Sequence, residues 1–304
     1  MGLGDRLAAR VAERDSQLVL GIDPDPGALW PASQAAGEGL SAAEAVSAAV
    51  LAQCRALIDA AGPACVAAKP QLARFEALGE PGRSVLGAVV AHAHEAGLLV
   101  IADGKRGDID VTAGAYAASL FGGLETPFGR VEGLGADLVT VNPLMGRDAI
   151  MPFIDAARAC DAGVLLLVHT SNPGAADIEE LAVEGGGTVW ERTASLVDEL
   201  GADGVGAAGI SDVGAVMGAT APWHLERARE LMPRATFLLP GIGAQGGRVE
   251  EQRAAFRPGR AGGLVSASRS IAGAHLAGGG APAEAAREEA ERLRRAAWEL
   301  SGVR

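Results

Sequence analysis

Short apolar runs recur along the chain, and each is followed by Gly, Pro, Asn or Asp and then by a stretch with helical periodicity. This alternation is typical of repeated βα units. The runs are continuously apolar and lack polar alternation, as expected for strands of a parallel sheet that is covered on both faces. The candidate strands number eight and span residues 17–22, 64–69, 98–103, 137–141, 163–168, 213–219, 236–241 and 263–268.

The segments between these runs have recognisable helix ends. Ser41 with Glu44, and Thr188 with Glu191, have the spacing of capping boxes, which predicts that helices start there. The segment 282–300 is rich in Ala, Glu and Arg, and its apolar positions fall on one stripe, so we expect a closing outer helix. Eight βα units in 304 residues favour an α/β fold with a single (β/α)₈ barrel, the TIM barrel, over a doubly wound sheet. No Pro/Ser-rich linker interrupts the pattern, so we expect one domain over residues 1–304.

The net charge of the chain limits the kinds of partner that it can bind. Lys and Arg total 26 against 38 Asp and Glu, which gives a formal net charge of −12. The field of the whole chain therefore repels a phosphate backbone, and binding to nucleic acid is disfavoured. An anionic ligand would have to be held by a local cluster of cations and amides.

Cysteine usage and the N-terminus bear on the compartment. Cys54, Cys65 and Cys160 are odd in number, and their spacing fits neither a disulfide framework nor a zinc ribbon, which favours a reducing compartment. Charges interrupt the first twenty residues, so we expect no signal-peptide core, and we expect no run that approaches the length of a membrane span. We therefore expect a cytoplasmic protein without a membrane partner.

Polar residues collect where the predicted strands end, and in a barrel of this type the active residues lie at those carboxyl ends. The segment ADGKRGDIDVT, residues 102–112, places the carboxylates of Asp103 and Asp108 around the ammonium of Lys105 directly after a strand. A surface ion-pair turn would give the same pattern. Lys69 ends the neighbouring strand, however, and a second ammonium beside this group favours a functional site.

The segment PGIGAQGG, residues 240–247, matches G-x-G-x-x-G at Gly241, Gly243 and Gly246. A dinucleotide site is disfavoured because the motif lies near the C-terminus and the next strand offers no acidic residue for a ribose. Loops after the last two strands of such barrels often hold phosphate with backbone amides. Arg269 would add a forked cation there, although a salt bridge at the barrel rim is the alternative.

Taken in order, these motifs resemble the orotidine 5′-phosphate decarboxylase family, specifically its longer bacterial branch. Two positions depart from the usual family pattern: Gly104 stands where Ala is usual, and Leu144 stands where Tyr is common. Neither departure removes a charged group. The matching segments are GIDPDP, AAKPQLARFEALG, IADGKRGDIDVTAGAYA, TVNPLMG, HTSNP, GAT, PGIGAQGG and SASRSI.

The resemblance implies decarboxylation of orotidine 5′-phosphate to uridine 5′-phosphate, the last step of de novo pyrimidine nucleotide synthesis, without a cofactor or metal. Lys105 would stabilise a carbanion-like state at C6 and donate the proton to it. Asp103 would lie near the leaving carboxylate, and Lys69 would contact the ribose and the charge network. Asp108 and Thr112 would reach across the interface of a homodimer.

The same resemblance implies the roles of the substrate-binding residues. Asp23 would bind the ribose hydroxyls, and Ser171 would face the edge of the pyrimidine. Gln245 and Arg269 would hold the phosphate, with Gly243 in the same loop as Gln245.

Two other functions remain open at this stage. A magnesium-dependent sugar-phosphate decarboxylase, an aldolase or a hexulose-phosphate synthase of the same barrel superfamily shares the D-x-K-x-x-D turn. These enzymes place a carboxylate metal ligand after the second strand, where this chain has Lys69, and an ammonium there would repel Mg²⁺. A non-catalytic barrel that binds a phosphate ligand is the second alternative, and the complete set of charged residues argues against it.

The histidines give no sign of a metal site in the sequence. They are His92, His94, His169, His224 and His275, and none has a recognised ligand spacing. We therefore predict no metal site.

Overall fold

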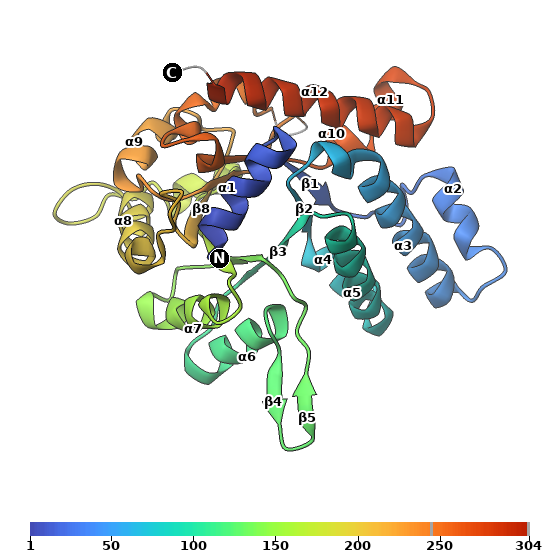
Figure 1. Cartoon of the computed structure of the whole chain (residues 1–304), viewed down its shortest axis with the longest axis horizontal. Helices are drawn as coiled ribbons and strands as arrows, with labels where there is room; N and C mark the ends of the chain where they lie inside the picture. The colour runs from blue at the N-terminus through green and yellow to red at the C-terminus, as the bar shows by residue number, and fades with distance from the viewer. Residues whose placement is uncertain (244–245, 303–304) are drawn as a thin grey trace.

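The computed structural model describes residues 1–243 and 246–302. Its eight parallel strands close into a barrel in the order β1-β10-β9-β8-β7-β6-β3-β2, with helices around it (Figure 1). The (β/α)₈ prediction is confirmed, and each predicted strand is present. The barrel strands are β1 Leu18–Ile22, β2 Ala67–Pro70, β3 Leu99–Arg106, β6 Leu138–Val141, β7 Gly163–His169, β8 Val213–Met217, β9 Phe237–Leu239 and β10 Gly263–Ala267.

The helices form the outer layer, and their buried faces pack against the barrel. Both predicted capping boxes are present, at Ser41 with Glu44 and at Thr188 with Glu191. The longer helices are α1 Leu3–Arg14, α3 Ala42–Ala61, α5 Glu80–Glu95, α6 Asp110–Leu120, α7 Arg147–Arg158, α8 Val189–Gly201, α9 His224–Leu231 and α12 Pro282–Gly302. The short helices are α2 Pro31–Gln34, α4 Leu72–Glu76, α10 Arg269–Ala272 and α11 Ala274–Gly278.

Helix α1 lies across one end of the barrel (Figure 1). Leu3, Leu7 and Val11 of α1 are buried together with the aliphatic side chains that fill the barrel, such as Leu138 and Leu165. The helix approaches closely because Gly4 has no side chain: a Cβ at this position would meet the Ile210 carbonyl oxygen at 2.2 Å. The amino-terminal end of the barrel is therefore closed, and only the carboxyl end is available for a ligand.

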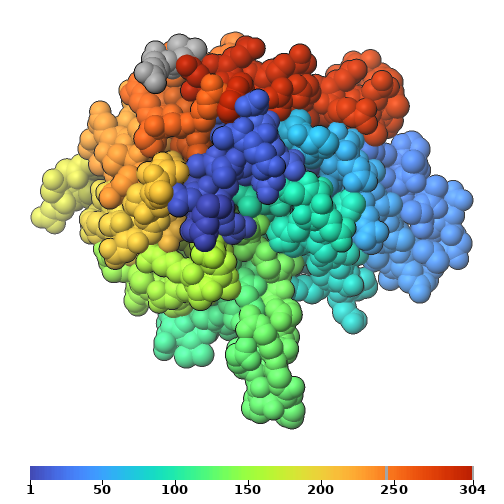
Figure 2. Space-filling view, in the orientation of Figure 1, coloured from blue at the N-terminus to red at the C-terminus, as the bar shows by residue number. Residues whose placement is uncertain are grey.

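Two features of the fold differ from what the sequence predicted: a small hairpin and a long apolar helix. A small antiparallel hairpin, β4 Leu124–Thr126 with β5 Gly129–Val131, projects from the body of the protein (Figures 1 and 2). Its strands have three residues each and are largely exposed, so they leave no apolar run in the sequence.

The expectation that no segment reaches the length of a membrane span is wrong. The helical segment Ala42–Ala64 is long and apolar enough to cross a bilayer by length and composition, and half of its apolar stretch is buried inside the fold. Helix α3 packs against α5 and α12. The helix carries few charged residues because it is rich in Ala and covers the barrel.

Candidate active site

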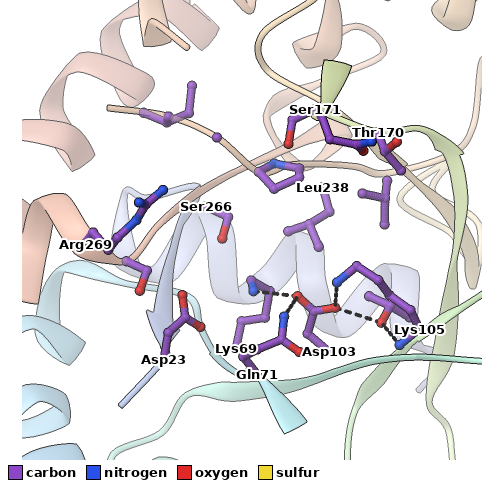
Figure 3. Close-up of a pocket in the computed structure, with 17 residues that line it drawn as sticks. Asp23, Lys69, Gln71, Asp103, Lys105, Thr170, Ser171, Leu238, Ser266 and Arg269 are labelled. Atoms are coloured by element: carbon purple, nitrogen blue, oxygen red, sulfur yellow. Dashed lines mark hydrogen bonds and ion pairs between the residues drawn. The ribbon is translucent and has the colours of Figure 1, made fainter. Parts of the chain in front are cut away.

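A cavity of about 370 Å³ opens at the carboxyl ends of the strands. Figure 3 shows its polar side chains, with Asp23 and Arg269 on one side and Lys105 on the other. A ligand lying across this cavity would therefore meet a different chemistry at each end. The polar lining consists of Asp23, Lys69, Gln71, Asp103, Lys105, Thr140, Thr170, Ser171, Asn172, Ser266, Ser268 and Arg269.

Asp103 is the centre of the charged group. Its two carboxylate oxygens accept hydrogen bonds from different ammonium groups, Lys69 Nζ at 2.7 Å and Lys105 Nζ at 2.6 Å (Figure 3). The Lys69 side chain is 8% exposed and that of Lys105 is 45% exposed. Lys69 is thus a buried partner, whereas Lys105 remains accessible to a ligand.

The local backbone aims Lys105 into the cavity. The pairing of β3 with β6 shifts register between Ala102 and Arg106, and Lys105 between them has a left-handed φ of +48°. The strand prediction ended at Asp103, but β3 continues past this irregularity to Arg106. The Lys105 amide donates to Thr140 Oγ1 at 2.9 Å, which fixes the turn. Bulges of this kind re-aim side chains near active sites.

Sequence reasoning missed two further partners of Asp103. Thr140 Oγ1 donates to Asp103 Oδ1 at 3.0 Å, and Gln71 Nε2 donates to Asp103 Oδ2 at 3.2 Å. Gln71 directly follows β2, and Thr140 lies near the end of β6, the two strands that flank β3. This position near the strand ends was the available signal. With four donors, the buried carboxylate is held in one orientation.

The chain contains two lysines among its 26 cationic residues, and both contact Asp103. Elsewhere the cation is always arginine. The two side chains are not equivalent, since a guanidinium stays protonated while an ammonium in a tuned site can release a proton. The position of both lysines therefore points to proton chemistry at this site.

Burial alone would raise the pKa of Asp103, but the ammonium groups of Lys69 and Lys105 outweigh it and hold that pKa at about 2. The carboxylate consequently stays charged at neutral pH. A fixed negative charge flanked by two positive charges is a preorganised field, which needs little rearrangement during a reaction.

This depressed pKa predicts an acid-dependent contribution to stability. The folded value lies below the unfolded value of 3.8, so the contribution is present above pH 3.8 and is lost as the pH falls through 3.8 towards about 2. We expect this group to account for about 2 kcal/mol of unfolding free energy lost between pH 5 and pH 2. Urea unfolding followed by tryptophan fluorescence across this range would measure the loss.

The matched comparison is Asp103→Asn against Asp59→Asn, because Asp59 is an exposed carboxylate paired with His92. The Asp103 variant should lack the acid-dependent component, and the Asp59 variant should follow the wild type. Parallel acid slopes for wild type and Asp103→Asn would contradict the depressed pKa.

The other end of the cavity carries the groups predicted to bind ribose and phosphate. Asp23 Oδ1 is buried and has no hydrogen-bond partner among the described residues, so it is ready to accept a bond from a ligand hydroxyl. Arg269 is exposed at the start of α10, directly after β10. Gly243 has a φ of +77°, and a Cβ there would lie 3.2 Å from Ser270 Cβ, so the loops after β9 and β10 touch.

Of the remaining predicted residues, one lines the cavity, two do not, and one is not described by the structure. Ser171 lines the cavity, at its rim after β7. Asp108 and Thr112 do not line it; Asp108 is partly buried and Thr112 is exposed at the start of α6. Gln245 lies outside the described residues.

The structure also joins histidines that the sequence treated as unrelated. His169 and His224 both contact Glu180, although no ligand spacing links them along the chain. Spacing along the chain could not reveal this cluster of possible ligand atoms, which only the fold brings together. The grouping arises because β7 and the segment that follows β8 are neighbours in the barrel.

The chain is similar to known proteins along most of its length. The family model for the orotidine 5′-phosphate decarboxylase / HUMPS family matches residues 16–288. The chain is 40% identical over 279 residues to the orotidine 5′-phosphate decarboxylase of Rhodopirellula baltica, covering 90% of this chain and 89% of that protein. It is 39% identical to the protein of the same name from Deinococcus radiodurans, covering 91% of each. The solved structure of Leishmania donovani OMP decarboxylase superimposes with a TM-score of 0.75 at 30% identity and covers 100% of both chains.

Proposed function

The chain belongs to the orotidine 5′-phosphate decarboxylase family, and on this premise we propose how the cavity at the barrel mouth carries out the reaction. The family resemblance inferred from the motifs is confirmed. The reaction converts orotidine 5′-phosphate to uridine 5′-phosphate in pyrimidine biosynthesis. The observation that carries the assignment to this cavity is the Lys69–Asp103–Lys105 array, with its one accessible ammonium.

The chemistry explains why an ammonium is needed. When the bond between C6 and the carboxyl carbon breaks, CO₂ leaves and the electron pair stays in an sp² orbital at C6, which the π system of the ring cannot accept. Lys105 places a positive charge beside this pair and then transfers a proton from Nζ to C6. The Lys105 amine regains its proton from solvent. Asp103 and Lys69 hold Lys105 in place throughout.

Lys105 alone is not sufficient. A charge pair about 4 Å apart contributes roughly 4 kcal/mol at an effective dielectric near 20, whereas demanding enzymes lower barriers by ~20 kcal/mol or more. The remainder must come from exclusion of water, from the fixed charge array and from binding energy at the distant phosphate. Arg269 and the residues near it therefore contribute to catalysis although they lie across the cavity from Lys105 (Figure 3).

We assign the position of each end of the substrate from the arrangement of side chains in Figure 3. The phosphate lies at Arg269 and the loops carrying Gly243 and Gln245, and the ribose hydroxyls donate to Asp23. The pyrimidine then extends towards Lys105 and Ser171. The unpartnered buried oxygen of Asp23 supports this orientation.

A magnesium-dependent reaction is disfavoured by the position of Lys69. Its ammonium is buried and bonded to Asp103 where the rival enzymes place a metal-binding carboxylate. We expect exhaustive EDTA treatment to leave the loss of orotidine 5′-phosphate absorbance unchanged. Loss of activity that Mg²⁺ restores would overturn the mechanism, and no activity before treatment would favour a non-catalytic phosphate-binding barrel.

We also propose that the active form is a homodimer in which Asp108 and Thr112 complete the partner's site. Exposed apolar side chains beside these residues support an interface: Ile109 is 57% exposed and Val111 is 79% exposed. Such a concentration of apolar surface marks an interaction site. Two-fold symmetry would make each patch meet its own copy.

Shared sites predict recovery of activity when two inactive variants are mixed. Lys105→Ala and Asp108→Ala should each be inactive as homodimers. If Asp108 crosses the interface, a hybrid carries both changes in one site and none in the other. Dissociating and reassociating an equal mixture should then restore about a quarter of wild-type activity. Sedimentation would verify reassociation, and a reassociated mixture without activity would place Asp108 in its own chain's site.

A cytoplasmic location is the remaining proposal. All three cysteines are free, with Cys54 and Cys65 buried and Cys160 exposed. Free thiols suit a reducing compartment. The substrate class, a nucleotide precursor, is consistent with the same location.

A further inference from the structure

A second cluster of polar side chains lies outside the Asp103 cavity and includes a residue of the loop that follows β7. It consists of His169 at the end of β7, Glu180 in the loop, and His224 at the start of α9. Both imidazole Nε2 atoms contact Glu180 Oε1, at 2.8 Å from His169 and 2.9 Å from His224. The candidate ligand atoms of the three residues all lie within 4.8 Å of one another.

This set of atoms matches the coordination chemistry of zinc. Two imidazole nitrogens and one carboxylate oxygen form a common zinc ligand set that leaves one tetrahedral position open. Zinc bonds of ~2.0 to 2.1 Å place neighbouring ligands ~3.3 Å apart, so Glu180 would have to withdraw by about 0.5 Å from each ring. Its side chain is one third exposed and has room to move. The ligand nitrogens of the two histidines, which lie within 4.8 Å of each other, would have to reach the same spacing.

The two rings are held in place by packing. The His169 side chain is 7% exposed, and its ring lies edge-on to Trp190 with the centroids 6.2 Å apart. Trp190 also packs on His224 at 5.0 Å, and the two imidazole centroids are 4.5 Å apart. Ligands that are already ordered lose little conformational entropy when an ion binds.

The cluster also opens to a cavity. A space of about 380 Å³ is lined by His169, Glu180 and His224 together with polar residues such as Thr220. It gives an ion a route of entry and leaves room for an exchangeable ligand in the open position. Its wall is shared, since Thr170, Ser171 and Asn172 line both this space and the Asp103 cavity.

We propose that His169, Glu180 and His224 form a binding site for a divalent metal ion of the zinc class, with an open coordination position facing this second cavity. Imidazole ligands select Zn²⁺ over Mg²⁺ and Ca²⁺, which prefer oxygen ligands. The ion ties β7 and the following loop to α9 and so stabilises the fold. The site is separate from Lys105 and Asp103, and it does not depend on the decarboxylation mechanism.

The test is a zinc titration of the full chain. Cys160→Ser protein, which lacks the one exposed thiol among the cysteines, is stripped with EDTA, dialysed, and titrated with Zn²⁺ against a chromophoric chelator. We expect one tight equivalent per chain and a higher thermal midpoint. Mg²⁺ at the same concentration should shift neither reading.

Two variants locate the ion. In the same background, His224→Ala removes a ligand, and Glu180→Gln removes the charge while keeping the shape of the side chain. Each should weaken zinc binding by at least about 100-fold, because even outer partners of metal ligands change affinity 10–100-fold. Glu180→Gln keeps the test valid if His224→Ala fails to fold.

The matched control is His92→Ala. The two ring nitrogens of His92 face different carboxylates, those of Asp59 and Glu95, so its contacts do not converge. This variant should bind zinc like the parent. The absence of a tight equivalent, or full binding in either His224→Ala or Glu180→Gln, would overturn the site. Decarboxylation by the stripped protein is measured separately, so failure of one proposal is distinguishable from failure of the other.

Discussion

Replacing Lys105 with alanine should abolish turnover while the protein still binds a nucleotide product analogue. The variant loses both the positive charge beside C6 and the proton donor, and we expect kcat/KM to fall by at least about 10⁴-fold. The fold should survive because the Lys105 side chain is 45% exposed and Lys69 still neutralises Asp103. Absorbance assays would give the rate, and calorimetry with uridine 5′-phosphate would give the affinity.

Lys105→Arg separates the two roles of the side chain. It keeps a positive charge at the same end of the cavity but cannot readily release a proton. We expect its activity to stay close to that of the alanine variant. Near-normal turnover in Lys105→Ala would exclude Lys105 as the proton donor, and high activity in Lys105→Arg would mean that charge alone is sufficient.

Arg269→Ala should lower kcat/KM for orotidine 5′-phosphate by about 10²- to 10³-fold, or roughly 3 to 4 kcal/mol. Arg269 lies across the cavity from Lys105, so the loss would reflect phosphate binding energy that is used in the transition state (Figure 3). The nucleoside orotidine, which has no phosphate, should react equally slowly with wild type and variant. Parallel assays of the two substrates would measure the difference.

The control for Arg269 is Arg257→Ala, which removes an exposed arginine paired with Glu226 away from the cavity lining. It should leave both substrates unaffected. Equal losses on nucleotide and nucleoside in Arg269→Ala would contradict the phosphate role. In that case Arg269 would act by supporting the barrel rim, as the salt-bridge alternative supposed.

The barrel could be predicted because its strands are buried on both sides. Such strands require unbroken apolar runs, and eight of these runs are visible in the sequence. The β4–β5 hairpin was missed because exposed three-residue strands need no apolar run. The expectation that no segment reaches the length of a membrane span failed for a related reason: an Ala-rich helix that covers a barrel has the same low charge as a membrane span.

The active-site charges were visible because strand ends in a barrel share one mouth. Lys69, Asp103 and Lys105 each follow an apolar run, and this position distinguishes them from surface charges. Their partners were less visible, since Thr140 and Gln71 are uncharged polar residues of ordinary type. Apart from their position near strand ends, nothing local in the sequence marks them as contacts of Asp103.

The sequence by itself determined which segments form the barrel strands and which charged groups stand at their ends. Tertiary structure decided which of those groups meet. Asp103 joins Lys69 across 34 residues and Thr140 across 37, and Glu180 joins His169 and His224 from separate segments. Contacts of this kind depend on the register and closure of the barrel, which set the distances between neighbouring strand ends. Local periodicity carries no information on that register, so only the folded barrel brings these atoms together.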